Sequence, residues 1–79
     1  MNRKEWADLA TKEFRGKKVK CIGWLSAEEV EKMDWCMSAP VIVFEDDSWI
    51  FAMQDDEGND AGALATSSEK VPILPVIGV

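Results

Sequence analysis

The sequence predicts an α+β fold in which an N-terminal helix precedes a curled, mainly antiparallel sheet of about four or five strands. Three observations predict it. Two apolar runs, residues 41–44 and 49–53, flank a short acidic turn; residues 2–14 have the apolar spacing of an amphipathic helix; and residues 17–25 begin with a strand-like alternation. Because the central strands are apolar on both faces, we expect the sheet to be covered on both faces and to curl towards a small open barrel, with one short helix inserted after the first strand.

Residues 2–14 form the first predicted helix. Asn2 is a good N-cap, and Glu5 follows at the spacing of a capping box. Large apolar residues recur every three or four positions and build one stripe, which consists of Trp6, Leu9, Ala10 and Phe14. Gly16 suits the left-handed backbone that ends a helix. We expect the stripe to pack on the sheet, since amphipathic helices usually belong to the core.

The first strand is predicted at residues 17–25. Lys18 and Lys20 alternate with apolar neighbours, as in a strand with one covered face. Apolar residues then take over the lysine side around Gly23. This change of face indicates a bulge, or a strand that passes from the sheet edge into a covered interior.

A short second helix follows this strand. Ser26 and Glu29 have the spacing of a capping box, so the helix begins there and runs to about residue 34. A helix this short is marginal alone and depends on packing. Residues 36–39 are expected to be a loop that leads to Pro40, which favours an extended entry to the hairpin.

The hairpin is predicted from residues 41–44 and 49–53. β-Branched and aromatic side chains dominate both runs, and such side chains suit a pleated surface. The acidic segment between them, residues 45–48, is rich in turn-forming side chains. It lacks the Asp-Gly pair that would define the turn, so the turn type stays open.

The C-terminal part is less regular. Residues 63–65 fit either a third short strand or a single helical turn, and residues 66–70 are a polar linker. Residues 71–79 are strongly apolar, but Pro72 and Pro75 remove two backbone donors. This predicts an edge strand or an extended tail that packs across its own sheet or against a second copy.

Length and composition predict a single domain over residues 1–79, with the helix in residues 1–16 and the β-rich core in residues 17–79. The hydrophobic content of 47% is typical of globular proteins and argues against disorder. No apolar run is long enough to cross a bilayer, and the first residues lack the hydrophobic region of a signal peptide. We therefore expect a cytoplasmic protein with no membrane partner.

Charge is unevenly distributed along the chain. Residues 1–20 carry seven Lys and Arg against three Asp and Glu, whereas residues 21–79 carry two against twelve. Nucleic-acid binding needs clustered positive charge, which only residues 15–20 offer, and the acidic remainder repels a polyanion. The sequence therefore disfavours nucleic acid as a partner. The same layout suits head-to-tail self-association, or a partner attracted to the basic end.

Residues for catalysis are scarce. The chain has no histidine, so the commonest general base is absent and neither Cys21 nor Cys36 has a histidine to activate it. Paired carboxylates serve hydrolases, but nothing in the sequence raises the pKa of one of them specifically. We expect no enzyme activity and no cofactor. Without a secretion signal the cysteines are expected to be free, buried thiols, although one disulfide would form in an oxidising compartment.

Residues 55–62 form the most distinctive segment. Carboxylate and amide oxygens in this pattern suit a divalent cation such as calcium. The candidate ligands are Asp55, Asp56, Glu57, Asn59 and Asp60. The spacing departs from an EF-hand loop, and the triplet typical of calcium-binding nonapeptide repeats occurs once. We therefore favour a structural turn, in which Gly58, Asn59 and Gly62 take left-handed backbone angles, and keep cation binding as the alternative.

The four tryptophans exceed the average usage of about one residue in a hundred. We expect most of them to enlarge a small core. Trp24, at a strand end, and Trp49, just after the hairpin turn, are the ones expected at the surface, where clustered indoles line grooves for peptides. The sequence predicts a small interaction or accessory domain that binds a protein partner, or itself, through Trp24, Trp49 and residues 55–60.

A resemblance supports the fold. The acidic hairpin, the run Asp-Asp-Glu-Gly-Asn-Asp-Ala-Gly-Ala-Leu at residues 55–64 and the Leu-Pro-Val ending at residues 74–76 resemble a group of short bacterial and phage proteins of unknown function, over about residues 18 to 77. The group has no established activity, so the resemblance implies a fold and not a mechanism. It also implies Asp-Gly at the hairpin turn, where this chain has Asp47 and Ser48.

Overall fold

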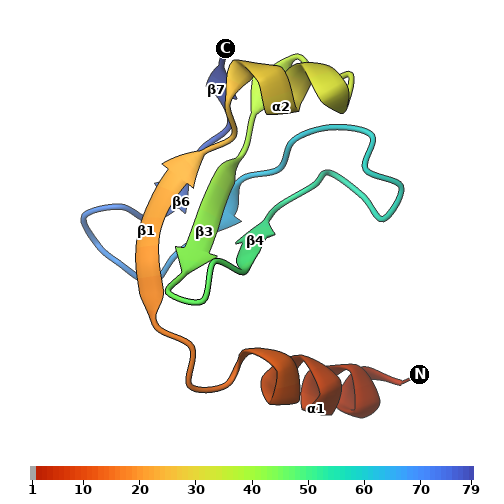
Figure 1. Cartoon of the computed structure of the whole chain (residues 1–79), viewed down its shortest axis with the longest axis vertical. Coiled ribbons are helices and arrows are strands. Elements are labelled where there is room, and N and C mark those ends of the chain that lie inside the picture. Colours follow the sequence, from red (N-terminus) through yellow and green to blue (C-terminus); the bar gives the residue numbers. More distant parts are fainter. Residues whose placement is uncertain (1) are drawn as a thin grey trace.

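The computed structural model describes residues 2–79 and has the predicted α+β composition, with two helices and short antiparallel strands in open sheets (Figure 1). The helices are α1 (Arg3–Phe14) and α2 (Ala27–Lys32). The strands are β1 (Val19–Trp24), β2 (Met37–Ser38), β3 (Pro40–Phe44), β4 (Trp49–Phe51), β5 (Leu64–Ala65), β6 (Ile73–Leu74) and β7 (Ile77–Gly78).

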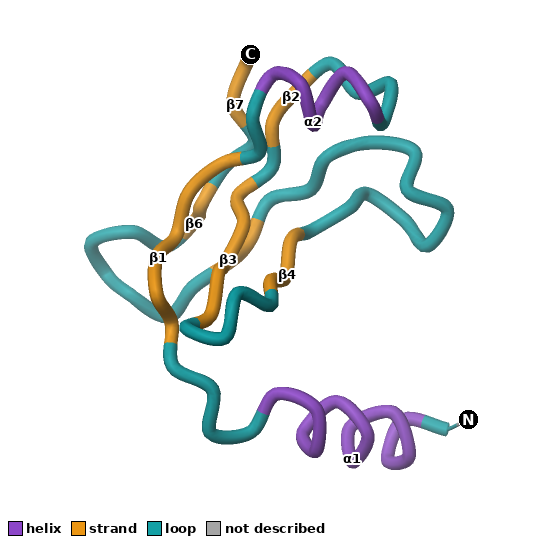
Figure 2. Tube along the Cα trace, in the orientation of Figure 1, coloured by secondary structure: helices purple, strands orange, loops and turns teal. Residues whose placement is uncertain are grey.

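The central sheet has three antiparallel strands in the order β1-β3-β4 (Figure 2). β3 and β4 form the predicted hairpin, in which Val41 pairs with Phe51 and Val43 pairs with Trp49. The middle strand begins at Pro40, the position in a strand where a missing N–H disturbs the ladder least.

The hairpin turn is a three-residue loop, residues 45–47. The Phe44 amide donates to the Ser48 carbonyl at 2.8 Å, and the Asp47 amide donates to the Phe44 carbonyl at 2.9 Å. Asp47 has φ 69°, the left-handed conformation that completes this type of loop. The turn that the sequence left open is therefore one in which an aspartate occupies a position that glycine prefers.

The bulge in β1 lies elsewhere than predicted. The register between β1 and β3 shifts between Val19 and Cys21, whereas Gly23 pairs regularly with Val41. Lys20 stands at the shift, and its Nζ donates to Asp47 Oδ1 at 3.1 Å. The bulge is therefore close to the hairpin turn and not at the glycine.

The remaining strands form two separate antiparallel pairs, β2 with β7 and β5 with β6. This division differs from the predicted single curled sheet of four or five strands. Residues 36–39, expected to be a loop, contain β2, whose partner β7 comes from the far end of the sequence. Pro72 and Pro75 interrupt the backbone donors of the tail, which keeps β6 and β7 short.

Helix α1 begins as predicted, with the Asn2 side chain accepting a hydrogen bond from the Glu5 amide at 2.9 Å. Its packing differs, because none of its residues is buried and Trp6 is 59% exposed. Figure 1 shows α1 beyond the hairpin-turn end of the central sheet, at the opposite end from α2. The prediction that its apolar stripe packs on the sheet is therefore wrong for Trp6 and Leu9, whereas Phe14 at the end of the stripe packs against Phe44 of β3. Gly16, with φ 79°, turns the chain between α1 and β1.

The core lies around α2. Ser26 and Glu29 form the predicted capping box, which fixes the start of this helix and directs Val30 inwards. The cluster of buried apolar residues is Leu25, Val30, Trp35 and Ala39. Ser38 is buried with them, and its hydroxyl donates to the Leu25 carbonyl at 2.6 Å. A core of this size leaves much apolar surface outside, as expected for a short chain.

Candidate protein-binding groove

A groove of about 500 Å³ lies between α2 and one face of the central sheet. Side chains alternate between the two faces of a strand, so the pairs Val41–Phe51 and Val43–Trp49 place four large side chains on the same face. The lining residues are Leu25, Glu29, Lys32, Met33, Val41, Val43, Trp49 and Phe51. Gly23, which pairs with Val41, adds no side chain to this face, and its surroundings are open. The groove is therefore an apolar face of the sheet that α2 flanks and does not cover.

Trp49 is the most exposed apolar side chain of the groove, at 58%. Its ring stacks on Phe51 with centroids 5.1 Å apart, and Phe51 meets the buried Trp35 edge to face at 6.0 Å. Three aromatic rings thus run from the surface of the groove into the core. Such packing holds the Trp49 indole in place before anything binds.

Two charged residues of α2 border the groove. Glu29 Oε1 accepts a hydrogen bond from the Ser26 amide at 2.9 Å. The hydrogen bonds from the Ser26 backbone and hydroxyl lower the pKa of Glu29, because they favour its ionised form. Lys32, one turn further along α2, adds the opposite charge. The groove therefore has an apolar floor and a polar border on the α2 side.

Trp24, the other predicted surface tryptophan, lies elsewhere. It pairs with Pro40, the neighbour of the Gly23–Val41 pair, so its side chain points to the opposite face of the sheet. It is half-buried, and its indole Nε1 donates to the Pro75 carbonyl at 2.8 Å. The structure does not bring Trp24 and Trp49 together. Trp24 instead attaches the C-terminal segment to the sheet.

The acidic loop is a closed turn. Met53 and Ala61 form a bridge at its base, and the Trp35 indole Nε1 donates to the Gly58 carbonyl at 2.8 Å. Gly58 has φ 73°, the left-handed angle that was predicted for it. Asn59 and Gly62 do not have left-handed angles, which corrects the prediction for those two residues. Gly62 is needed for another reason, since a Cβ there would lie 3.0 Å from the Met53 carbonyl oxygen.

Asp55 organises this loop from within. Its Oδ1 accepts from the amides of Glu57 at 3.0 Å and Asn59 at 3.3 Å, and its Oδ2 accepts from Asn59 Nδ2 at 2.8 Å. These bonds, above all that from the Asn59 side chain, lower the pKa of Asp55. Both carboxylate oxygens thus serve the turn itself.

The five candidate cation ligands are not assembled into a site. Asp60 Oδ1 accepts a hydrogen bond from the Ala61 amide at 2.8 Å, whereas Asp56 and Glu57 are exposed. Among residues 2–79 there is no group of three or more His, Cys, Asp or Glu side chains that could hold a metal ion. The arrangement supports a structural role for the loop.

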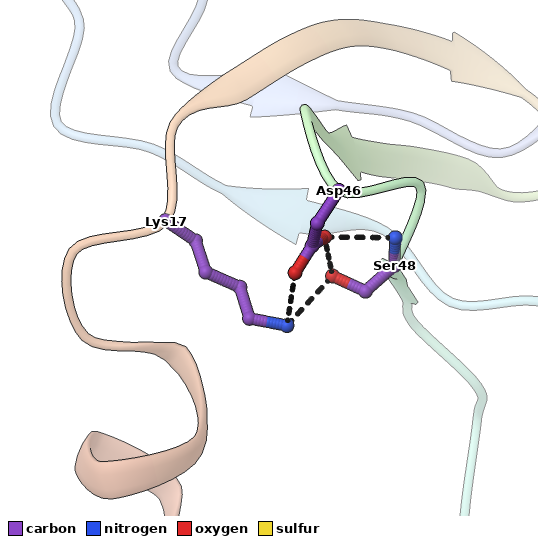
Figure 3. Close-up of polar contacts among 3 residues, drawn as sticks. All are labelled: Lys17, Asp46 and Ser48. Atoms are coloured by element: carbon purple, nitrogen blue, oxygen red, sulfur yellow. Dashed lines mark hydrogen bonds and ion pairs between the residues drawn. The ribbon is translucent and has the colours of Figure 1, made fainter.

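A second polar cluster joins α1 to the hairpin turn (Figure 3). Lys17 Nζ lies 3.0 Å from Asp46 Oδ2 and donates to Ser48 Oγ at 2.8 Å. It also lies 5.2 Å from the Phe14 ring centroid and 5.8 Å from that of Phe44. Hydrogen bonds from the Ser48 hydroxyl and amide, and then from Lys17, lower the pKa of Asp46 to about 2. These contacts fix where α1 leaves the body of the molecule.

Sequence reasoning missed both the groove as a whole and Lys17. The two-residue spacing of Asp46 and Ser48 is a signal for the turn, but no local pattern points to Lys17. Strands that are apolar on both faces led us to expect cover on both faces, whereas one face remains open in the groove. Cys21, opposite Val43 on this face, and Cys36 are free, as predicted, but exposed, so the expectation that they are buried is wrong.

No family model, no curated protein and no solved structure matches this chain. The resemblance to short bacterial and phage proteins therefore stays a prediction. Within residues 2–79, neither helix has the length and apolar character needed to cross a membrane.

Proposed function

We propose that this chain is a small protein-binding domain and that the groove between α2 and the β3–β4 hairpin takes the partner. The observation that carries this proposal is the 58% exposed indole of Trp49 above an apolar groove of about 500 Å³. Large aromatic side chains that sit at the surface next to a hollow are the usual anchors of protein interfaces.

The rigidity of the groove supports the same function. Trp49 is stacked on Phe51, so binding would not have to order a free side chain. Ordering such side chains is one of the main costs of association. The groove is also open to solvent, which suits apolar side chains presented by a protein better than a small ligand that must be enclosed.

The chemistry of the groove favours a protein over other partners. Its lining offers apolar surface with one carboxylate and one ammonium group, which suit packing and orientation rather than catalysis or a cofactor. The net charge of −6 disfavours nucleic acid. The two exposed free thiols suit a reducing compartment, which supports the cytoplasm as the place of action.

The experiment places a photo-crosslinking amino acid with an aromatic side chain at position 49 in the full chain, so that an apolar ring remains at the anchor, and irradiates the source cell. We expect a covalent adduct with a protein, which is either another protein or a second copy of this chain. The matched control puts the same group at position 73, because Ile73 is also an exposed apolar residue but lies in β6. If position 49 gives no protein adduct, or no more than position 73, the proposal fails.

Calcium binding by residues 55–60 stays the alternative prediction. Since both oxygens of Asp55 already accept hydrogen bonds within the loop, we expect calcium to have no specific effect there. Titration to millimolar calcium, followed by NMR, tests this. Saturable shifts confined to residues 55–60 would favour the cation site over the structural turn.

A further inference from the structure

Two apolar surfaces of the described residues, 2–79, are left largely uncovered. One is the groove with Trp49, and the other is the outer part of the α1 stripe, Trp6 and Leu9, whereas Phe14 at the end of the stripe packs against Phe44. Trp6 and Leu9 are exposed, and no residue of α1 is buried. An amphipathic helix and an apolar groove are the two halves of a common mode of protein recognition.

The structure holds the two surfaces apart in one molecule. Figure 1 shows α1 projecting beyond the hairpin-turn end of the sheet, whereas α2, which borders the groove, stands at the opposite end. Lys17 fixes this arrangement through Asp46 and Ser48, and Phe14 packs against Phe44 with ring centroids 5.9 Å apart. The helix is therefore presented outwards.

Charge favours a second copy as the occupant. Residues 1–20 have a net charge of +4 and residues 21–79 a net charge of −10. The excess lies in the residues that follow α1, which are Arg15, Lys17, Lys18 and Lys20, because α1 itself carries three Lys and Arg against three Asp and Glu. This basic segment of one molecule is attracted to the acidic body of another, and α2 at the groove border adds Glu28, Glu29 and Glu31 against Lys32. Such complementarity steers encounter and sets orientation.

We propose that the groove, used as in the proposed function, binds the stripe of α1 from a second copy of this chain. The exchange is reciprocal in a two-fold dimer, so each molecule gives one helix and receives one. Trp6 and Leu9 enter the groove and cover Trp49. A helix of twelve residues is about 18 Å long, so the contact is small and the dimer is a weak, reversible one.

Sedimentation velocity of the full chain over a range of concentrations is the first test. The wild type is expected to shift from monomer to dimer. Trp6→Ala in the stripe and Trp49→Ala in the groove should each weaken the dimer about tenfold or more, as loss of an interface anchor does. Both side chains are exposed, so both variants keep the fold, which circular dichroism checks.

Two controls match these variants. Thr11→Ala changes an uncharged, exposed residue on the polar side of α1, and Ile73→Ala removes an exposed apolar side chain from β6. Neither should change the dimerisation constant. Mixing Trp6→Ala with Trp49→Ala should restore part of the association, because the mixed dimer keeps one intact helix–groove contact. A monomeric wild type, or a dimer unaffected by both tryptophan variants, overturns the proposal.

Spin labelling then tests whether α1 of one molecule lies at the groove of another, and it leaves Trp6 and Trp49 unchanged. Cys36→Ser leaves Cys21, exposed on the groove face opposite Val43, as the only thiol for a nitroxide spin label. The spin-labelled chain is mixed with a second chain that carries no spin label and is enriched in nitrogen-15. We expect the label to broaden the amide signals of α1 in the other molecule. Broadening that spares α1 overturns the proposal.

The crosslink at position 49 separates this inference from the function on which it rests. Adducts with a second copy support both. Adducts with other proteins alone leave the protein-binding function standing and overturn self-recognition. An absence of protein adducts overturns both.

Discussion

Asp46 shows how a single exposed side chain links the fold to pH. The Ser48 hydroxyl and amide, together with Lys17, lower its pKa from 3.8 to about 2. Because the pKa is lower in the folded chain, the ionised carboxylate stabilises the fold above about pH 4, and this contribution is lost as the pH falls towards 2. The hairpin turn is thus an acid-sensitive contact.

We expect Asp46→Asn to remove this part of the acid response. Urea unfolding between about pH 5 and pH 2 should show a smaller loss of stability for the variant than for the wild type, since the amide does not titrate. Ser48→Ala removes the hydroxyl hydrogen bond, which is the largest cause of the lowered pKa, and should therefore raise the pKa of Asp46. An NMR titration of the Asp46 carboxyl carbon measures this pKa. Identical pH profiles of wild type and Asp46→Asn would contradict the assignment.

Trp35 is the residue that joins the core to the acidic loop. It is 7% exposed, and its Nε1 donates to the Gly58 carbonyl. Trp35→Phe keeps an aromatic ring but removes the donor, so we expect a loss of about 1–3 kcal/mol in the free energy of unfolding. Trp6→Phe on the exposed face of α1 should change it by less than about 0.5 kcal/mol in dilute protein. Equal effects of the two changes in urea unfolding would refute this role.

At the scale of elements, the hairpin turn contains a position that disfavours most side chains. Asp47 has φ 69°, where glycine is unstrained and a Cβ costs about 1–2 kcal/mol. Asp47→Gly and Asp47→Ala both remove the ion pair with Lys20, so their difference isolates the backbone. We expect the glycine variant to be more stable than the alanine variant by about 1 kcal/mol. Chemical denaturation measures the two free energies of unfolding. An alanine variant that is as stable as the glycine variant, or more stable, would contradict the prediction.

Elements with local signals were predictable. Asn2 and Ser26 mark the starts of the helices through their own side chains, and the β-branched run into Phe44 defines β3. β2 was not predictable, because Met37 and Ser38 become a strand only through Gly78 and Ile77, some forty positions away. A sequence states what each segment prefers, but not which distant segment it meets.

Part of the candidate site could likewise be predicted from local signals, and part could not. Trp49 was predicted to be exposed from its place just after the turn, and the structure confirms it. The groove beneath it was not predicted, because Val43 and Phe51 line it only once α2 stands beside an open face of the sheet. Trp24 was predicted at the surface from its place at a strand end, and its contact with the C-terminal segment at Pro75 has no local signal in the sequence.

For the whole molecule, the structure separates a helix without buried residues from a body built around α2. An isolated helix of twelve residues is marginal in water. We therefore expect the amide protons of α1 to exchange faster than those of β3 in dilute protein, and to gain protection as the concentration rises. Hydrogen exchange followed by mass spectrometry measures both. Equal protection of α1 and β3 at low concentration would contradict this.

The aromatic series that begins at Trp49 and ends at Trp35 gives the chain intrinsic optical probes. Indole emission depends on contact with water, so the exposed Trp49 and the buried Trp35 emit at different wavelengths. Replacing Trp6 and Trp24 by phenylalanine leaves these two fluorophores and keeps an aromatic ring at position 6 to enter the groove. Occupation of the groove would then shift the emission of Trp49 to shorter wavelength. Unfolding would shift the emission of Trp35 to longer wavelength, and neither measurement needs an added dye.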